Sequence, residues 1–323
     1  MLLLQIAERG IPKLMLRYIL QRLVMGIIAL LVVATTTFFL MQAVPGDPLR
    51  QEKNVPESIR KNLEVKYGLN KPIMTQYVIY MEKMFLHGDF GISFKQENRT
   101  VNEIIADHFG VSAVLGLMAL SFAFIFGPAL GIIAGLNRNK WPDYVAMVLA
   151  VLGISIPSFV LAYFLQYGMA LKLGLFPVGG WEWSNPMTMV LPALSLGMIV
   201  MASLARLMRS SMLEVVQQDY IKTAKAKGLS VLAIVIKHQI RNAILPVVIY
   251  VGPLFAAILT GSFVIESIFG IPGLGQFFVN SVQDLDYTAI MGLTVFYSGF
   301  AILVILIFDL IYTLIDPRIR LAH

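Results

Sequence analysis

The chain has 323 residues, of which 58% are hydrophobic and 14% charged, and its mean hydropathy is +0.77. Soluble domains are about 45–50% apolar and about 25% charged, so this composition excludes an ordinary soluble domain and indicates a polytopic membrane protein. No cysteine is present, which excludes disulfides, thiolate metal ligands and a cysteine nucleophile. The formal net charge of +6 is attributed to membrane topology and not to nucleic-acid binding, because the basic residues fall in particular loops.

The apolar stretches along the chain predict six transmembrane helices. A bilayer core about 30 Å thick requires about 20 apolar residues per helix. Six stretches meet this length, at residues 20–42, 112–136, 144–169, 187–207, 244–265 and 290–315. Backbone groups in lipid must be satisfied within their own segment, so we expect an all-α fold.

Lysine and arginine predict the orientation of these helices, because they gather in short cytoplasmic loops. They precede the first span, lie between the second and third, fill the segment between the fourth and fifth, and follow the sixth. The opposite short loops hold only Lys172 and collect the acids Glu182, Glu266, Asp284 and Asp286. Both termini are therefore expected in the cytoplasm.

The segment between the first two spans, residues 44–108, is expected to be extracytoplasmic and helical. Residues 55–67 and 76–86 both have a helical apolar spacing. Pro56 and Pro72 suit the first turns of two short helices. These features predict a small ordered cap.

Glycines and prolines in the spans predict close packing and bends. Gly127, Gly131 and Gly135 are spaced four apart on one face of the second span, and small residues at this spacing let helices approach closely in lipid. Pro157 and Pro192 lie in or near the third and fourth spans, where proline favours a kink. Bundle packing is the simplest role for the glycines, and the prolines are candidate hinges of a moving pathway.

The polar segment between the fourth and fifth spans is the main candidate for a functional site. Its core, residues 219–230, interleaves lysines with alanines. Small residues at Ala224, Ala226 and Gly228 would let another backbone approach, and the lysines keep the segment in water. These properties suit a helix that docks into a groove of another protein; a solvated basic linker is the alternative.

Motifs for catalysis or metal binding are missing from the sequence. It has no G-x-x-x-x-G-K-[ST] phosphate loop, no H-E-x-x-H helix and no G-x-S-x-G elbow. The four histidines are far apart, so we expect neither a catalytic nor a metal site. The middles of the spans carry almost no charge, which argues against ion coupling, and Asp309 near the end of the last span is expected to pair with a loop lysine. Energy for transport would then come from a partner.

Several motifs in order along the chain resemble the peptide and nickel permease family of ABC importers. They lie at residues 38–48 (F-F-L-M-Q-A-V-P-G-D-P), 67–72 (Y-G-L-N-K-P), 88–93 (G-D-F-G-I-S), 153–159 (G-I-S-I-P-S-F), 173–177 (L-G-L-F-P), 261–275 (G-S-F-V-I-E-S-I-F-G-I-P-G-L-G) and 316–320 (D-P-R-I-R). Within the family the chain looks most like the B-type permease subunit of oligopeptide importers. Residues 1–14 match no family feature and are expected to be an N-terminal extension or to reflect a misassigned start.

The resemblance implies a type I ABC importer permease fold with a cytoplasmic coupling loop. The implied organisation is a first transmembrane helix within 15–43, the outer segment 44–108, a core 109–316 that contains the coupling loop 208–243, and a tail 317–323. In the loose E-A-A-x-x-x-G pattern of such loops, Lys222-Thr223-Ala224 stands at E-A-A without the leading Glu, and Gly228 stands at the Gly. The implied coupling residues are Tyr220, Thr223, Ala224, Ala226, Lys227, Gly228 and Leu229.

The resemblance also implies partners and a function. The partners are a sister permease in a heterodimer, two ATP-binding subunits and an extracytoplasmic peptide-binding protein. ATP and Mg would be bound by the ATPase chains, so no cofactor is expected in this chain. The implied function is ATP-driven import of oligopeptides across the bacterial cytoplasmic membrane; dipeptide, nickel or glycoside import, an ion-coupled secondary transporter and a non-transporting scaffold stay open.

The last outer loop, E-S-I-F-G-I-P-G-L-G at residues 266–275, is expected to be an irregular chain that folds back at the membrane surface. The candidates for an outer gate or a contact with the binding protein are Phe269, Gly270, Pro272, Gly273 and Gly275. A structural turn without such a role is the alternative.

Overall fold

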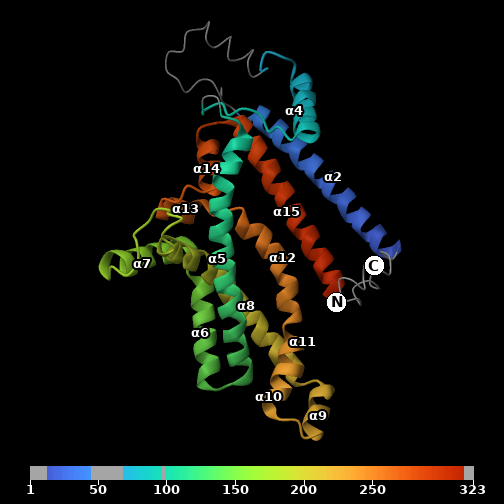
Figure 1. The fold of residues 1–323 in the computed structure, drawn as a ribbon, viewed down its shortest axis with the longest axis vertical. Helices are drawn as coiled ribbons and strands as arrows, with labels where there is room; N and C mark the ends of the chain where they lie inside the picture. The colour runs from blue at the N-terminus through green and yellow to red at the C-terminus, as the bar shows by residue number, and fades with distance from the viewer. Residues whose placement is uncertain (1–12, 45–67, 97–98, 316–323) are drawn as a thin grey trace. The chain divides into compact units, whose positions relative to one another are not determined.

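The computed structural model describes residues 13–44, 68–96 and 99–315, which form helices and their connections (Figure 1). Among these residues four helices are long and apolar enough to cross a membrane. They are α2 (Lys13–Ala43), α5 (Val101–Leu136), α8 (Met187–Val216) and α15 (Tyr287–Ile315). Three bent pairs of shorter helices raise the possible number of spans to seven. The expectation of an all-helical protein that crosses the membrane several times is confirmed.

Some sequence expectations fall outside the described residues. They are residues 1–12 of the expected extension, the helix at 55–67 with Pro56, and the tail at 317–323.

The chain separates into two compact units. The first combines residues up to Asp107 with those from Phe278 onward, and the second comprises His108–Phe277. The helices α5 and α14 (Leu274–Gln283) each contribute residues to both units.

In the first unit, α2 packs along α15. An ion pair joins the two helices, with Arg22 Nη1 at 3.3 Å from Asp309 Oδ2. Within the described residues, Asp309 thus pairs with an arginine of the first span, where the sequence suggested a loop lysine. The helix α4 (Ile73–His87) begins after Pro72, as its sequence predicts, and ends at Gly88 with a φ of 63°.

A buried aspartate ties the segment after α4 to the start of α15. Asp286 Oδ1 accepts hydrogen bonds from the backbone N–H groups of Phe94 and Ala289, both at 3.1 Å. The Ser93 hydroxyl donates to the other oxygen of the same carboxylate. Asp286 therefore satisfies a free N–H at the start of α15 while it anchors the segment around Ser93.

The second unit is built around α8, which packs against most of the other long helices of the unit. Its remaining helices, in chain order, are α6 (Trp141–Ser155), α7 (Ser158–Leu165), η1 (Gln166–Lys172), α9 (Asp219–Ala226), α10 (Val231–Ile234), η2 (Val235–Ile240), α11 (Arg241–Ala243), α12 (Leu245–Leu259) and α13 (Phe263–Phe269).

The third and fifth apolar stretches are not the straight spans that their lengths suggest. The third turns by 104° between α6 and the helical segment Ser158–Lys172. Pro157 lies at this bend with an extended ψ of 140°, and it has no N–H with which to continue the helix. The fifth ends at Leu259, because Gly261 with a φ of 92° redirects the chain before α13 begins. By contrast, α8 continues through Pro192 without a break.

Candidate functional site

The polar segment between α8 and α12 folds into a series of short helices. Gly228 follows α9 with a φ of 75°, the left-handed conformation in which helices commonly end. Ser230 then caps α10, because its Oγ accepts a hydrogen bond from the backbone N–H of Ala233 at 3.3 Å. The chain continues through η2 and α11 into α12.

Part of this segment is buried against the chain itself. Ile221 and Ala224 of α9 pack with Ile234 and Val215. The small side chain of Ala224 therefore serves contacts within the chain, whereas the sequence pattern suggested that it opens a surface to another backbone. Gly228 has open space around it, and its left-handed backbone explains the glycine without a docked partner.

The outward surface of the segment carries exposed apolar side chains. Val231 and Leu232 have exposed fractions of 78% and 69%, and Tyr220, Leu229 and Ile236 are exposed as well. We call these five residues the coupling patch. Apolar surface costs about 25 cal/mol per Å² when it stays in water, and a group of exposed apolar residues marks a surface that another molecule covers.

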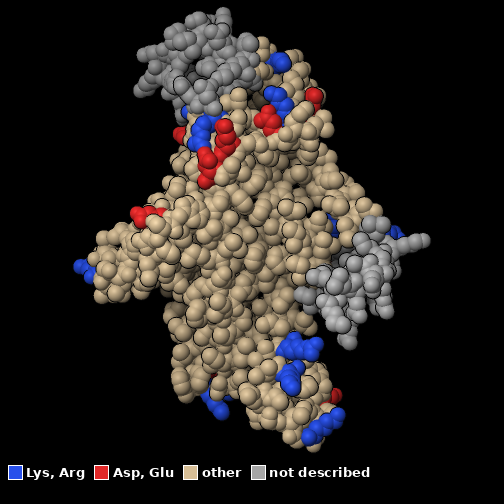
Figure 2. All heavy atoms as spheres, in the orientation of Figure 1, with Lys and Arg blue, Asp and Glu red and all other residues tan. Residues whose placement is uncertain are grey.

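Basic residues surround the coupling patch, and Figure 2 shows lysines and arginines gathered over α9 and the segment after it. Lys225, Ala226 and Lys227 are exposed. The Thr223 hydroxyl donates to the carbonyl oxygen of Asp219 at 3.0 Å and so faces back into its own helix. Of the seven predicted coupling residues, only Ala224 is thus buried and holds α9 in place, and the other six are exposed.

A hollow of about 470 Å³ lies beside the coupling patch. The ends of α5 and α8 form one wall with Leu136 and Val216, and Leu229, Val231 and Gln239 form the other. The patch is therefore next to a concave surface, the shape into which a partner side chain can insert.

An ion pair between the buried Asp143 and the partly exposed Arg209 holds the turn between α5 and α6 against α8. Arg209 donates from Nε to Asp143 Oδ1 at 2.6 Å and from Nη2 to Asp143 Oδ2 at 2.8 Å. Asn139, with a φ of 60°, adds a backbone N–H to Oδ2 at 3.0 Å. This bidentate geometry is the strong form of such a pair, so the Asp143–Arg209 pair fixes α6 and α8 relative to each other.

The predicted glycine face of α5 lies against α8. A Cβ on Gly131 would come within 2.5 Å of the carbonyl oxygen of Ala205, and a Cβ on Gly127 within 2.8 Å of that of Met201. Gly135 is similarly close to Met212. The two backbones are therefore so close that only glycine fits at these positions.

The predicted outer loop differs from the irregular chain that its sequence suggests. Residues 263–269 are helical in α13, and a bend of 100° follows before α14. Glu266 is completely buried in this bend. Its Oε1 accepts from the Ser112 hydroxyl at 2.8 Å and from the Ser262 N–H at 3.3 Å, and its Oε2 accepts from the Gln276 N–H at 2.7 Å.

The glycines of this bend make room for that carboxylate. A Cβ on Gly273 would lie 2.5 Å from each of the two carboxylate oxygens of Glu266, and a Cβ on Gly261 would lie 2.5 Å from Oε1. A Cβ on Gly275 would lie 3.1 Å from Oε2. The Ser112 hydroxyl, in turn, accepts from the N–H of Leu274 at 2.8 Å. We call Glu266, its hydrogen-bond partner Ser112 and the three glycines that surround its carboxylate (Gly261, Gly273 and Gly275) the Glu266 clasp.

The other predicted outer residues lie around the clasp. Phe269 is buried, and its carbonyl oxygen accepts from the N–H of Gly180 at 2.6 Å. Gly270 and Pro272 are exposed, and Pro272 O lies 2.9 Å from Nδ1 of His108. Of the five candidates for an outer gate, only these two offer a surface to a partner.

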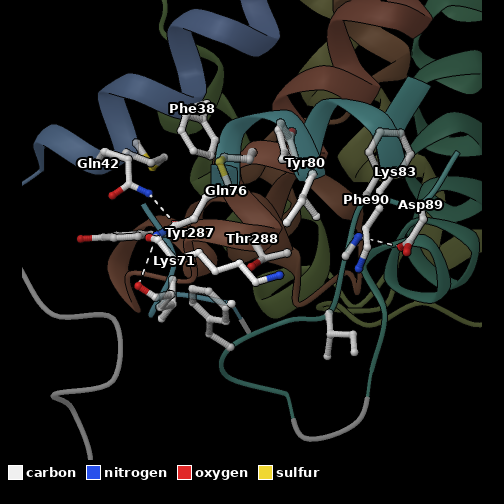
Figure 3. Close-up of a pocket in the computed structure, with 18 residues that line it drawn as sticks. Phe38, Gln42, Lys71, Gln76, Tyr80, Lys83, Asp89, Phe90, Tyr287 and Thr288 are labelled. Atoms are coloured by element: carbon white, nitrogen blue, oxygen red, sulfur yellow. Dashed lines mark hydrogen bonds between the residues drawn. The ribbon is translucent and has the colours of Figure 1, made fainter. Parts of the chain in front are cut away.

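The first unit has a hollow of its own, of about 290 Å³, between α2, α4 and the start of α15 (Figure 3). Phe38 and Gln42 reach it from α2, and Gln76 and Tyr80 from α4. Burial raises the pKa of the Tyr80 hydroxyl above its usual range, so this group stays protonated. The hollow thus has a mixed aromatic and amide wall.

Comparison with known proteins places these features in a family. A model of the binding-protein-dependent transport system inner membrane component matches residues 127–321. The chain belongs to this family. The model of the N-terminal part of such components matches residues 15–116. The family is one of membrane components of transport systems, in agreement with the several apolar helices of this chain.

Relatives of this transport component match it over almost their whole lengths. The dipeptide transport system permease protein DppB of Bacillus subtilis is 49% identical over 95% of this chain and 99% of that protein. The oligopeptide transport system permease proteins OppB of Haemophilus influenzae and Escherichia coli K12 are 44% and 45% identical over 95% of this chain and all of their own length.

A solved structure supports the fold of the transport component. A crystal structure of an amino acid ABC transporter with histidines aligns with a TM-score of 0.51 at 16% identity, over 67% of this chain and 94% of the other. The likeness to that transporter is one of fold.

Sequence reasoning missed several residues of this transport component. Glu266 looked like one more acid of an outer loop, and Asp143 had no visible partner in the sequence. The glycines at 261, 273 and 275 were the available signal for a crowded bend. Val231 and Leu232 lie within the predicted coupling loop 208–243 but were not among its predicted coupling residues, which end at Leu229; their position directly after the Ser230 cap was the available signal.

Proposed function

We propose that this chain is the membrane-spanning subunit of an ATP-driven importer of peptides. The relatives named as dipeptide and oligopeptide permeases support this proposal, since they match 95% of this chain and 99–100% of their own length. The coupling patch is the observation that carries it, because it offers an apolar surface to a soluble partner on a segment surrounded by lysines.

In this proposal an ATP-binding subunit docks on the coupling patch. Ile221 and Ala224 fix α9 to Val215 at the end of α8, while η2 and α11 connect the patch to α12. A push on the patch would therefore reach two long helices of the bundle. The partner can change the state of the bundle only by the difference between its docking free energies in the two states.

The rest of the proposed assembly is a sister permease, a second ATP-binding subunit and an extracytoplasmic peptide-binding protein. Both termini and the coupling patch face the cytoplasm in this proposal, as the distribution of lysine and arginine predicts. ATP and Mg are bound by the ATPase chains. The exposed Gly270 and Pro272 are the proposed contact with the binding protein or the sister permease.

Oligopeptides are the first candidate substrates, and dipeptides are the second. The motifs of the chain resemble the B-type permeases of oligopeptide importers, which supports the first candidate. The 49% identity to a dipeptide permease supports the second.

Purification from native membranes in mild detergent tests this proposal. We expect two ATP-binding chains, a sister permease and a peptide-binding protein to co-purify with the chain. The peptide retained in the binding protein gives the substrate length, with two residues favouring the dipeptide assignment. A chain that purifies alone and moves a solute into ATP-free vesicles would contradict the proposal and favour an ion-coupled transporter.

A further inference from the structure

The hollow beside the coupling patch contains a buried amide whose oxygen has no hydrogen-bond partner. Gln239 of η2 lines this hollow, and only 5% of its surface is exposed. Its Oε1 accepts no hydrogen bond from any residue that the structure describes. A buried acceptor without a donor costs free energy, so native structures usually pair such a group.

The π-helical turns of η2 place this amide in the hollow. Hydrogen bonds in a π-helix join residue i to residue i+5, so Gln239 lies on the same side of its segment as Ile234. Ile234 also lines the hollow, and it packs against Ile221 of α9. The packing that fixes α9 therefore also fixes the position of the amide.

The rest of the hollow combines apolar walls with basic residues. Leu213 and Val216 of α8 and Val235 of η2 contribute apolar surface. Arg138 and Lys225 line the hollow as well, and both are exposed. No carboxylate lines it within the described part of the chain. Repulsion from the two cations disfavours a lysine or arginine of a partner, so the donor that suits Gln239 is a neutral one.

Tyrosine and tryptophan are the side chains that combine an apolar body with a neutral donor. Their rings end in an O–H or an N–H, and this group usually finds an acceptor when the ring is buried. Both residues are enriched among those that anchor protein interfaces in desolvated pockets. Serine and threonine also carry a neutral donor, but they would leave most of a hollow of about 470 Å³ empty.

We propose that this hollow receives a tyrosine or tryptophan side chain of the ATP-binding subunit, which donates a hydrogen bond to Oε1 of Gln239. Leu229 and Val231 belong both to the coupling patch and to the wall of the hollow, so one partner would cover both. Carboxylates of the partner beside this anchor would pair with Arg138 and Lys225. The inference rests on the proposed function and adds the chemistry of one contact that the partner makes.

Gln239→Met tests the inference, because methionine has a similar length and no amide. The purified variant should resist heat as well as the unsubstituted chain or better, since it loses an unpaired buried acceptor. ATP-binding subunits titrated onto membranes that contain the permease pair should bind the variant about five-fold more weakly, as expected for the loss of one hydrogen bond. Gln218→Met removes an exposed amide of the same segment outside the hollow and is the matched control.

Photo-crosslinking identifies what enters the hollow in the assembled complex. Leu136 lines the hollow and is 43% exposed, so it can be replaced by p-benzoylphenylalanine. We expect cross-links to the ATP-binding subunit, at or next to a tyrosine or tryptophan. Cross-links to lipid alone, or to this chain alone, would show that another group fills the hollow and would overturn the inference.

Leu232→Ser in the coupling patch separates a failure of this inference from a failure of the proposed function. If Leu232→Ser weakens binding of the ATP-binding subunit and Gln239→Met does not, the patch binds the subunit without an anchor in the hollow. That result would overturn the inference and leave the proposed function in place. If neither variant changes the binding, the proposed function fails and the inference fails with it.

Discussion

The polar segment between α8 and α12, which we call the coupling segment, and the Glu266 clasp both have glycines in a turn between helices. The structural reason for the glycine differs between the two turns. Gly228 has a left-handed backbone and open space around it, so the turn leaves its neighbours Leu229 and Val231 exposed. Gly273 is buried against the carboxylate of Glu266. The first turn presents a surface, and the second closes around an internal polar group.

This difference separates a binding surface from a structural element. A turn that presents exposed apolar side chains retains contact area for a partner. A turn whose polar groups are satisfied within the chain has little surface left for a partner, and only Ser267, Gly270 and Pro272 remain exposed in the predicted outer loop. Substitutions in the coupling segment should therefore impair partner binding, whereas substitutions in the Glu266 clasp should lower the stability of the fold.

The largest effect is expected from Glu266→Ala. This change leaves the partly buried N–H groups of Ser262 and Gln276 without their acceptor, and a fully buried group of this kind costs about 1–3 kcal/mol. We expect a marked loss of folded chain from the membrane and a lower unfolding temperature in detergent. Glu182→Ala removes an exposed carboxylate and is the matched control. Equal heat resistance of the two variants would show that the clasp does not stabilise the fold.

The two glycines provide a smaller and more specific test. Gly273→Ala places a methyl group 2.5 Å from two carboxylate oxygens, and overpacking of this kind costs about 1–3 kcal/mol. Gly228→Ala meets no atom within 4 Å and should cost only the left-handed backbone, about 1–2 kcal/mol.

Asparagine distinguishes the two mechanisms, because it tolerates the left-handed conformation but is larger than alanine. Gly228→Asn should be better tolerated than Gly228→Ala, while Gly273→Asn should be worse than Gly273→Ala. Thermal unfolding of the four variants checks this order. If alanine and asparagine rank in the same order of stability at Gly228 and at Gly273, the two glycines are not required for different reasons.

Sequence patterns predict the elements that depend on local composition. The length of apolar runs locates α2, α5, α8 and α15, and Pro72 marks the start of α4. The Glu266 clasp could not be predicted in this way, because its partner Ser112 is 154 residues away in the sequence. The bend of 104° after α6 was also missed, because hydropathy reports the length of an apolar run and not its direction.

The coupling segment was predicted in position but not in detail. Its lysines and alanines indicate a polar helix, and they do not show that Ala224 faces inward while Leu232 faces outward. That division depends on the packing of Ile234 against α9, which brings together residues on both sides of the Gly228 turn.

The most direct test of the account measures peptide uptake by the reconstituted complex with Leu232→Ser in this chain. Loss of a buried leucine contact costs about 1.5–3 kcal/mol, so we expect ATPase binding and ATP-dependent uptake to fall about tenfold or more. Leu175→Ser is the matched control, since Leu175 is exposed to 61% and lies outside the coupling segment. The account predicts normal uptake for Leu175→Ser and normal amounts of chain for both variants. Normal uptake and normal ATPase binding with Leu232→Ser would contradict the claim that the coupling patch is where ATP hydrolysis acts on this chain.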